Sequence, residues 1–103
     1  MNNQDYRKLS SEELKNLRFY ATSIGNLNAA LEISQFIEMY GKEVEVVKGR
    51  KVPLGTIGIV FFVKRYGFEY WNSYTRVGFK NEAGKTFFTD YHNLKIIGKE
   101  TRA

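Results

Sequence analysis

The stretch VEVVKGRKVPLGTIGIVFFV, residues 44–63, determines the fold because it has the pattern of two strands joined by a basic loop. Valine alternates with glutamate from residue 44 to residue 46, as in a strand that has one face in water. Pro53 interrupts the alternation, and Gly55 and Gly58 predict a tight turn before the apolar run at residues 59–63. The loop between the two strands holds the densest positive charge in the chain, so we expect it to take part in function.

The chain after residue 63 is also predicted to be β. The stretch KRYGFEYWNSY, residues 64–74, has the composition of a long aromatic and polar loop. Three further strands are expected, at residues 75–80, 85–90 and 94–97. They are separated by a hairpin turn at residues 81–84 and a short turn at residues 91–93.

Adjacent phenylalanines in two of these strands are expected to face opposite sides, because side chains alternate along a strand. This applies to Phe61 and Phe62, and to Phe87 and Phe88. Five short strands in about sixty residues are too few for a sandwich and suit a small, strongly bent barrel instead.

The chain before residue 42 is predicted to be helical. Ser10 and Glu13 have capping-box spacing, and apolar residues then recur every three or four positions up to Ile24. The Gly25-Asn26 pair predicts a break, after which Asn26 or Asn28 caps a second helix that ends at Gly41; one uninterrupted helix is the alternative. Neither helix has the run of basic and amide side chains that reads DNA bases, so we expect the helices to cover an open side of the β unit or to contact a partner.

The predicted architecture is therefore α+β. It consists of an N-terminal helical segment (residues 1–41, one or two helices) packed on a five-stranded barrel (residues 42–98), followed by a polar tail (residues 99–103).

The barrel segment resembles a KOW-type element within an SH3-like barrel. KOW modules show a strand, a basic loop, and then two glycines three apart with a valine two residues after the second. Here that pattern is Gly55-Thr56-Ile57-Gly58-Ile59-Val60, preceded by the strand at residues 44–47. The loop GRKVPLG, residues 49–55, is about two residues longer than the usual spacing and carries a proline. The resemblance implies binding of RNA, DNA, or the transcription or translation machinery, although many small barrels of this kind bind protein.

The net charge of +5 is concentrated in the β segment. Residues 1–40 carry four basic and five acidic groups, which gives −1, and residues 41–103 carry twelve basic and six acidic groups, which gives +6. A basic, aromatic-rich segment beside a nearly neutral helical one indicates a polyanionic partner. The chain has no cysteine, no apolar run of bilayer length and a polar start, so we expect a cytoplasmic protein with no membrane partner.

The predicted nucleic-acid site combines cations for phosphates with rings on which bases stack. The residues expected to form it, in one shared positive groove, are Lys48, Arg50, Lys51, Lys64, Arg65, Tyr66, Trp71, Tyr74 and Arg76. Lys80 shares a strand face with Arg76 and could extend the site. No residue run is suited to reading base edges, so weak sequence selectivity is expected.

Catalysis finds no support in the sequence. His92 is the only histidine and lies in a predicted turn, with no elbow serine, no EF-hand loop and no phosphate-binding loop elsewhere. We therefore predict a protein that is not an enzyme and that uses no cofactor or metal. The alternative function is a protein-interaction module or regulator that docks on an acidic surface of a larger enzyme or of the transcription or translation machinery.

Overall fold

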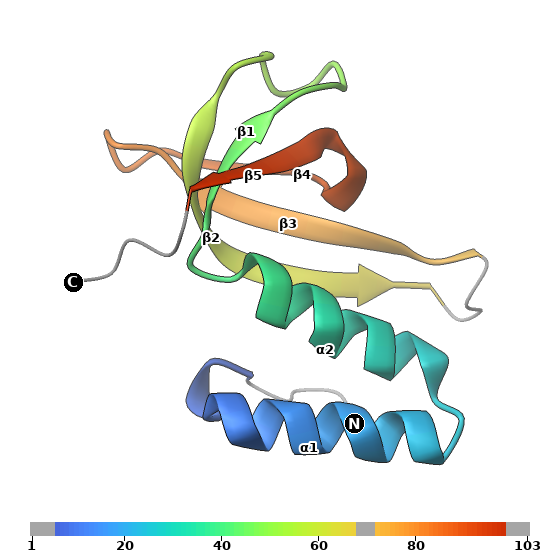
Figure 1. Cartoon of the computed structure of the whole chain (residues 1–103). Coiled ribbons are helices and arrows are strands. Elements are labelled where there is room, and N and C mark those ends of the chain that lie inside the picture. Colours follow the sequence, from blue (N-terminus) through green and yellow to red (C-terminus); the bar gives the residue numbers. More distant parts are fainter. Residues whose placement is uncertain (1–5, 68–71, 99–103) are drawn as a thin grey trace.

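The computed structural model describes residues 6–67 and 72–98, which form helices followed by a five-stranded sheet (Figure 1). The helical elements before the sheet are η1 (Tyr6–Lys8), α1 (Ser11–Ser23) and α2 (Leu27–Met39). The strands are β1 (Glu43–Val46), β2 (Ile57–Tyr66), β3 (Tyr74–Lys80), β4 (Thr86–Asp90) and β5 (Leu94–Gly98), with the short turn η3 (Tyr91–Asn93) before β5. The α+β class is confirmed, with two helices rather than one.

The helices begin and end where the capping chemistry places them. The Ser10 hydroxyl accepts a hydrogen bond from the Glu13 N–H at 3.1 Å, and the Glu13 carboxylate accepts one from the Ser10 N–H at 2.8 Å. Gly25 has a φ of 78°, a left-handed conformation that ends α1, and the Asn26 side chain then caps α2 by accepting from the Ala29 N–H.

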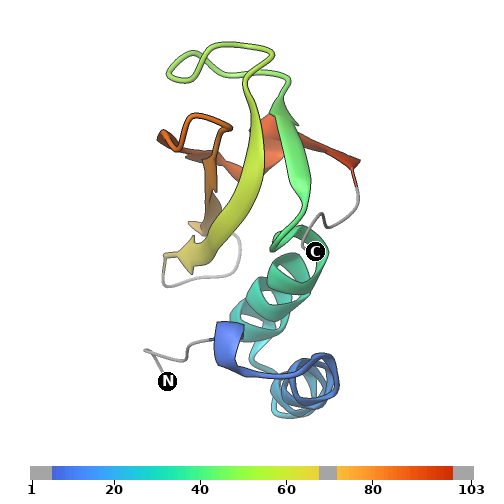
Figure 2. The ribbon, with the colours of Figure 1, turned by 90° about the vertical axis from the view of Figure 1, so that its left-hand side faces the viewer.

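The sheet is antiparallel throughout, in the order β4-β3-β2-β1-β5, so the last strand lies beside the first. The first residues of β2 pair with β1, and residues 59–66 pair with β3. Among the described residues β4 and β5 are not paired with each other, so the hydrogen-bonded sheet is open at these two strands. Figure 2 shows both helices below the strands, on one side of the molecule.

Helices and sheet share one hydrophobic core. Leu14 of α1 and Ile33, Phe36 and Met39 of α2 form a single cluster with the buried side chains of the sheet, Val44, Val46, Val60, Val63, Val77 and Phe79 among them. Helix α2 lies between α1 and the sheet (Figure 1), so the helical segment and the β segment are buried against each other.

The long loop predicted at residues 64–74 is shorter in the structure. Lys64, Arg65 and Tyr66 belong to β2, where they pair with Arg76, Thr75 and Tyr74 of β3. Tyrosines are common in strands, so the aromatic and polar composition that predicted a loop also fits the half-exposed end of a hairpin. The remaining connection is residues 67–73, within which residues 68–71 lie outside the described part of the chain.

The prediction that Phe61 and Phe62 face opposite sides is wrong. The register between β2 and β3 shifts between Val60 and Phe62, which is a β-bulge that adds one residue to β2. Both rings consequently contact Phe88, at centroid distances of 5.8 and 5.7 Å. Phe87 and Phe88 do face opposite sides as predicted, because Phe87 stacks on the buried Phe79.

Gly58 serves a close approach between strands rather than the predicted turn. It lies in β2 opposite Val44, and a side chain on it would place Cβ 2.6 Å from the Lys80 carbonyl oxygen and 2.7 Å from the Phe79 ring. The turn itself is made at Gly55, where φ is 87°.

Candidate nucleic-acid interface

The register between β2 and β3 sorts their side chains onto two faces. Directly opposed residues of an antiparallel pair share a face. The inner face carries the pair Val63 and Val77 and the pair Val60 and Phe79, all buried in the core. The other side, which we call the outer face, carries Ile59, Phe61, Phe62, Lys64 and Tyr66 of β2, Tyr74, Arg76, Gly78 and Lys80 of β3, and Thr86, Phe88 and Asp90 of β4.

Aromatic rings line the outer face at two places. Tyr66 and Tyr74 lie opposite each other with their rings stacked, 5.5 Å apart and at an interplanar angle of 18°. Tyr74 is 49% exposed, so one ring of this pair is open to solvent. The second group is Phe61, Phe62 and Phe88, in which the Phe88 ring contacts the other two edge to face.

Gly78 creates the space that the second group occupies. It is the strand partner of Phe88, and a Cβ at this position would lie 2.6 Å from the Phe88 ring and 3.1 Å from the Phe62 Cβ. The absence of a side chain at residue 78 therefore lets the Phe88 ring lie across β3.

Cations lie over these rings. The Lys64 ammonium is 5.5 Å from the centre of the Tyr66 ring, the Arg76 guanidinium is 5.1 Å from that of Phe88, and the Lys80 ammonium is 5.9 Å from that of Phe61. A cation–π contact at an exposed site contributes about 0.5–1 kcal/mol, which orients the cation without neutralising it. Asp90 of β4 lies directly opposite Arg76 in the strand register. The Asp90 Oδ1 accepts a hydrogen bond from the His92 N–H.

The basic loop between β1 and β2 lies at the other end of β2 (Figure 1). Its cations Lys48, Arg50 and Lys51 are exposed, while Val52 is buried and anchors the loop. Backbone hydrogen bonds fasten it further, from the Val47 N–H to the Asn93 carbonyl at 2.8 Å and from the Val46 N–H to the Thr56 carbonyl at 2.9 Å.

The predicted site residues that the structure describes therefore do not meet in one groove. The structure brings together Lys64, Tyr66, Tyr74 and Arg76 on the outer face. It places Lys48, Arg50 and Lys51 at the opposite end of β2, whose ten residues span roughly 30 Å. Trp71 lies outside the described residues. Lys48, Arg50 and Lys51 come shortly before β2, and Lys64 lies near its end. The two groups of cations are therefore separated by the length of this strand.

Arg65 faces the core side and connects α2 to the sheet. Its Nε donates to Asn28 Oδ1 at 3.3 Å and its Nη1 to Thr75 Oγ1 at 3.1 Å. The Thr75 hydroxyl in turn donates to Gln35 Oε1 in the buried interface with α2. This position favours a structural role for Arg65 over the phosphate contact that the sequence predicted.

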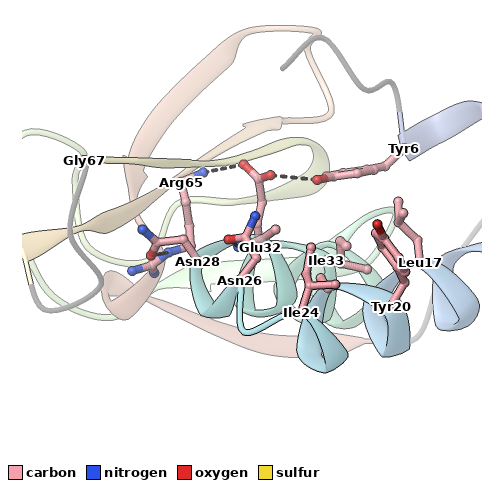
Figure 3. A pocket seen from close by; sticks show the side chains of 12 residues that line it. Tyr6, Leu17, Tyr20, Ile24, Asn26, Asn28, Glu32, Ile33, Arg65 and Gly67 are labelled. Atoms are coloured by element: carbon pink, nitrogen blue, oxygen red, sulfur yellow. Dashed lines mark hydrogen bonds between the residues drawn. The ribbon is translucent and has the colours of Figure 1, made fainter. Parts of the chain in front are cut away.

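A cavity of about 410 Å³ lies beside Arg65, between α1, α2 and the end of β2 (Figure 3). Its charged end is Glu32, whose Oε1 accepts from the Tyr6 hydroxyl and whose Oε2 accepts from the Arg65 N–H, both at 2.8 Å. Burial raises the pKa of Tyr6, and the hydrogen bond to Glu32 and its negative charge raise it further. Because both carboxylate oxygens are used within the chain, Glu32 ties η1 and β2 to α2.

Sequence reasoning missed the phenylalanines of the outer face. Phe61 was displaced by the bulge, which leaves no signature in a run of five apolar residues. The position of Phe88 on the outer face could have been predicted from the sequence. Counting residues outward from the turn at residues 81–84 pairs Phe88 with Gly78 in the neighbouring strand, which leaves room for its ring.

Comparison with protein-family models and with curated proteins gave no match. The resemblance to a KOW-type element thus stays a prediction. In residues 6–67 and 72–98, no helix is long and apolar enough to cross a bilayer. In the same residues, no group of three or more histidine, cysteine or acidic side chains is placed to hold a metal ion.

Proposed function

We propose that this chain is a small, non-enzymatic nucleic-acid-binding protein that holds single-stranded RNA or DNA on its outer face. The observation that carries the proposal is the alternation of rings and cations along the β2–β3 ladder. A ring pair (Tyr66 and Tyr74) is followed by a cation pair (Lys64 and Arg76) and then by the phenylalanine group.

The spacing of these rows suits an extended strand of nucleic acid. Residues two apart on one face of a strand are separated by about 6.7 Å, so a ring row and the next cation row are one such step apart. Bases stacked on exposed rings contribute roughly 1–3 kcal/mol each, while the cations hold the backbone. Rings and cations accept any base, which supports weak sequence selectivity.

We also propose that the β segment is an SH3-like barrel of the KOW type. Its support is the pairing of the last strand β5 with the first strand β1 after a meander from β1 to β4. Gly58, the glycine that matches the KOW pattern, is required by the close approach of β2 to β3, which gives the motif a physical reason in this chain.

The test is a titration of a fluorescent single-stranded oligonucleotide with the protein at increasing salt. In the Lys64→Glu/Arg76→Glu variant we expect weaker binding and a slope of log K against log salt that is shallower by roughly 1.4, at about 0.7 per phosphate contact. The control is Lys8→Glu/Lys95→Glu, which changes the net charge equally at exposed positions of η1 and β5. Equal losses in the two variants, or no binding by the unaltered protein at low salt, would contradict the proposal.

A further inference from the structure

A second hollow in the surface lies on the helices and shares no residue with the outer face. It is a groove of about 420 Å³ between η1, the start of α1 and the C-terminal half of α2, and it extends to Lys42, just after that helix. Its volume lies within the usual range for pockets that bind small molecules, so it can also hold one peptide side chain. We refer to it as the helix groove.

The floor of the helix groove is apolar. It is formed by Leu9, Leu14, Ile37 and the rings of Phe36 and Tyr40. Phe36 and Tyr40 stack on each other at 4.6 Å and 15°, and the Tyr6 ring lies edge-on to Phe36 at 5.4 Å. The stack covers one face of each of these two rings, and with Leu9, Leu14 and Ile37 they form an apolar floor that suits an inserted side chain.

The rim of the helix groove is cationic. Arg7, Lys15 and Lys42 line it, and within the described part of the chain no aspartate or glutamate is among its lining residues. Arg7 already interacts within the chain, so Lys15 and Lys42 are the two charges on which the argument rests. The Lys42 ammonium donates to the Glu38 backbone carbonyl at 2.9 Å, which positions the charge without neutralising it. Residues 1–40 carry a net charge of −1, so general basicity of that segment does not account for Arg7 and Lys15 on the rim; Lys42 joins them from the start of the basic part of the chain.

We propose that the helix groove binds an acidic peptide segment of a partner protein. One apolar side chain of the peptide enters between Leu14, Ile37 and Tyr40, and carboxylates on either side of it pair with Lys15 and Lys42 of the rim. Rim charges of this kind guide association and set specificity, while the buried apolar side chain supplies most of the affinity. This site does not depend on the nucleic-acid function proposed for the outer face.

The experiment starts from selection of binders out of a library of random short peptides on the full chain. We expect the selected peptides to carry aspartate or glutamate around a single large apolar residue. A synthetic copy, labelled with fluorescein, is then titrated with the Lys15→Glu/Lys42→Glu variant, and we expect a loss of affinity of at least roughly tenfold. Circular dichroism of that variant checks that the helices are intact.

The Lys64→Glu/Arg76→Glu variant is the matched control, because it changes the net charge by the same amount on the outer face. It should keep the peptide and lose the oligonucleotide, while Lys15→Glu/Lys42→Glu should do the reverse. The inference is overturned if the selected peptides are neutral or basic, if they bind both variants equally, or if a single-stranded oligonucleotide or dodecanoate displaces them from the groove. None of these outcomes alters the oligonucleotide titration, so the two proposals fail separately.

Discussion

At residue 78 the absence of a side chain determines how the outer face is built. A Cβ there would lie 2.6 Å from the Phe88 ring, closer than non-bonded carbon atoms come. We predict that Gly78→Ala destabilises the fold by about 1 kcal/mol, at the lower end of overpacking effects because the half-buried Phe88 ring can swing outward. Urea unfolding measures this, and the displaced ring should also weaken oligonucleotide binding.

A double-mutant cycle identifies the contact responsible. In a Phe88→Ala background the clash is removed, so Gly78→Ala should cost clearly less there than in the unaltered protein. Thr86→Ala, an exposed change in the same strand as Phe88, should leave stability within about 0.5 kcal/mol. A cost of Gly78→Ala that is the same in both backgrounds would show that Phe88 is not the obstacle.

Among the elements, α1 depends on a local cap that can be tested without disturbing the core. The Ser10 hydroxyl and the Glu13 carboxylate satisfy each other's backbone N–H groups. We predict that Ser10→Ala lowers the free energy of unfolding by about 1 kcal/mol, as loss of an N-cap commonly does. Ser11→Ala is the matched control, because Ser11 is an exposed helical residue one position further on. If both changes cost the same in urea unfolding, the cap is not what stabilises the start of the helix.

The elements that could be predicted from the sequence are those fixed by local chemistry. The Ser10–Glu13 pair, the break at Gly25 and the turns that separate the last three strands are short-range signals, and the structure confirms them. The bulge in β2, the extension of that strand to Tyr66 and the inward turn of Arg65 depend on partners more than ten residues away in sequence or on the pairing register. The residue pattern alone does not define that register. The sequence therefore predicted which kinds of residue form the candidate site, but it placed only some of them correctly in space.

Over the whole molecule, one core supports three separate groups of cations. Leu14, Ile33 and Phe79 belong to the same buried cluster, so helices and sheet hold one another in place. The cations occur on the outer face, on the loop between β1 and β2, and around the helix groove. With a net charge of +5 on 103 residues, this arrangement gives the molecule several contact points for polyanions instead of one groove.

The separation of the tyrosine and cation pairs of the outer face from the basic loop predicts how binding depends on the length of the nucleic acid. Tyr66 and Tyr74 lie at the end of β2 far from the loop, roughly 30 Å along the strand by the rise of its ten residues, and Lys64 and Arg76 lie two residues nearer. An oligonucleotide of about 4 nucleotides, the lower limit of known site sizes, can occupy the tyrosine and cation pairs of the outer face without reaching the loop. We therefore predict that Lys48→Glu/Arg50→Glu/Lys51→Glu leaves the binding of this short oligonucleotide unchanged.

With an oligonucleotide of about 20 nucleotides, well beyond one such site, the same loop variant should bind more weakly, and its salt slope should be shallower by roughly 2 for three phosphate contacts. Lys64→Glu/Arg76→Glu should weaken both lengths, which makes it the positive control. If the loop variant weakens the short oligonucleotide as much as the long one, the loop acts through general charge and not through contact with the same strand.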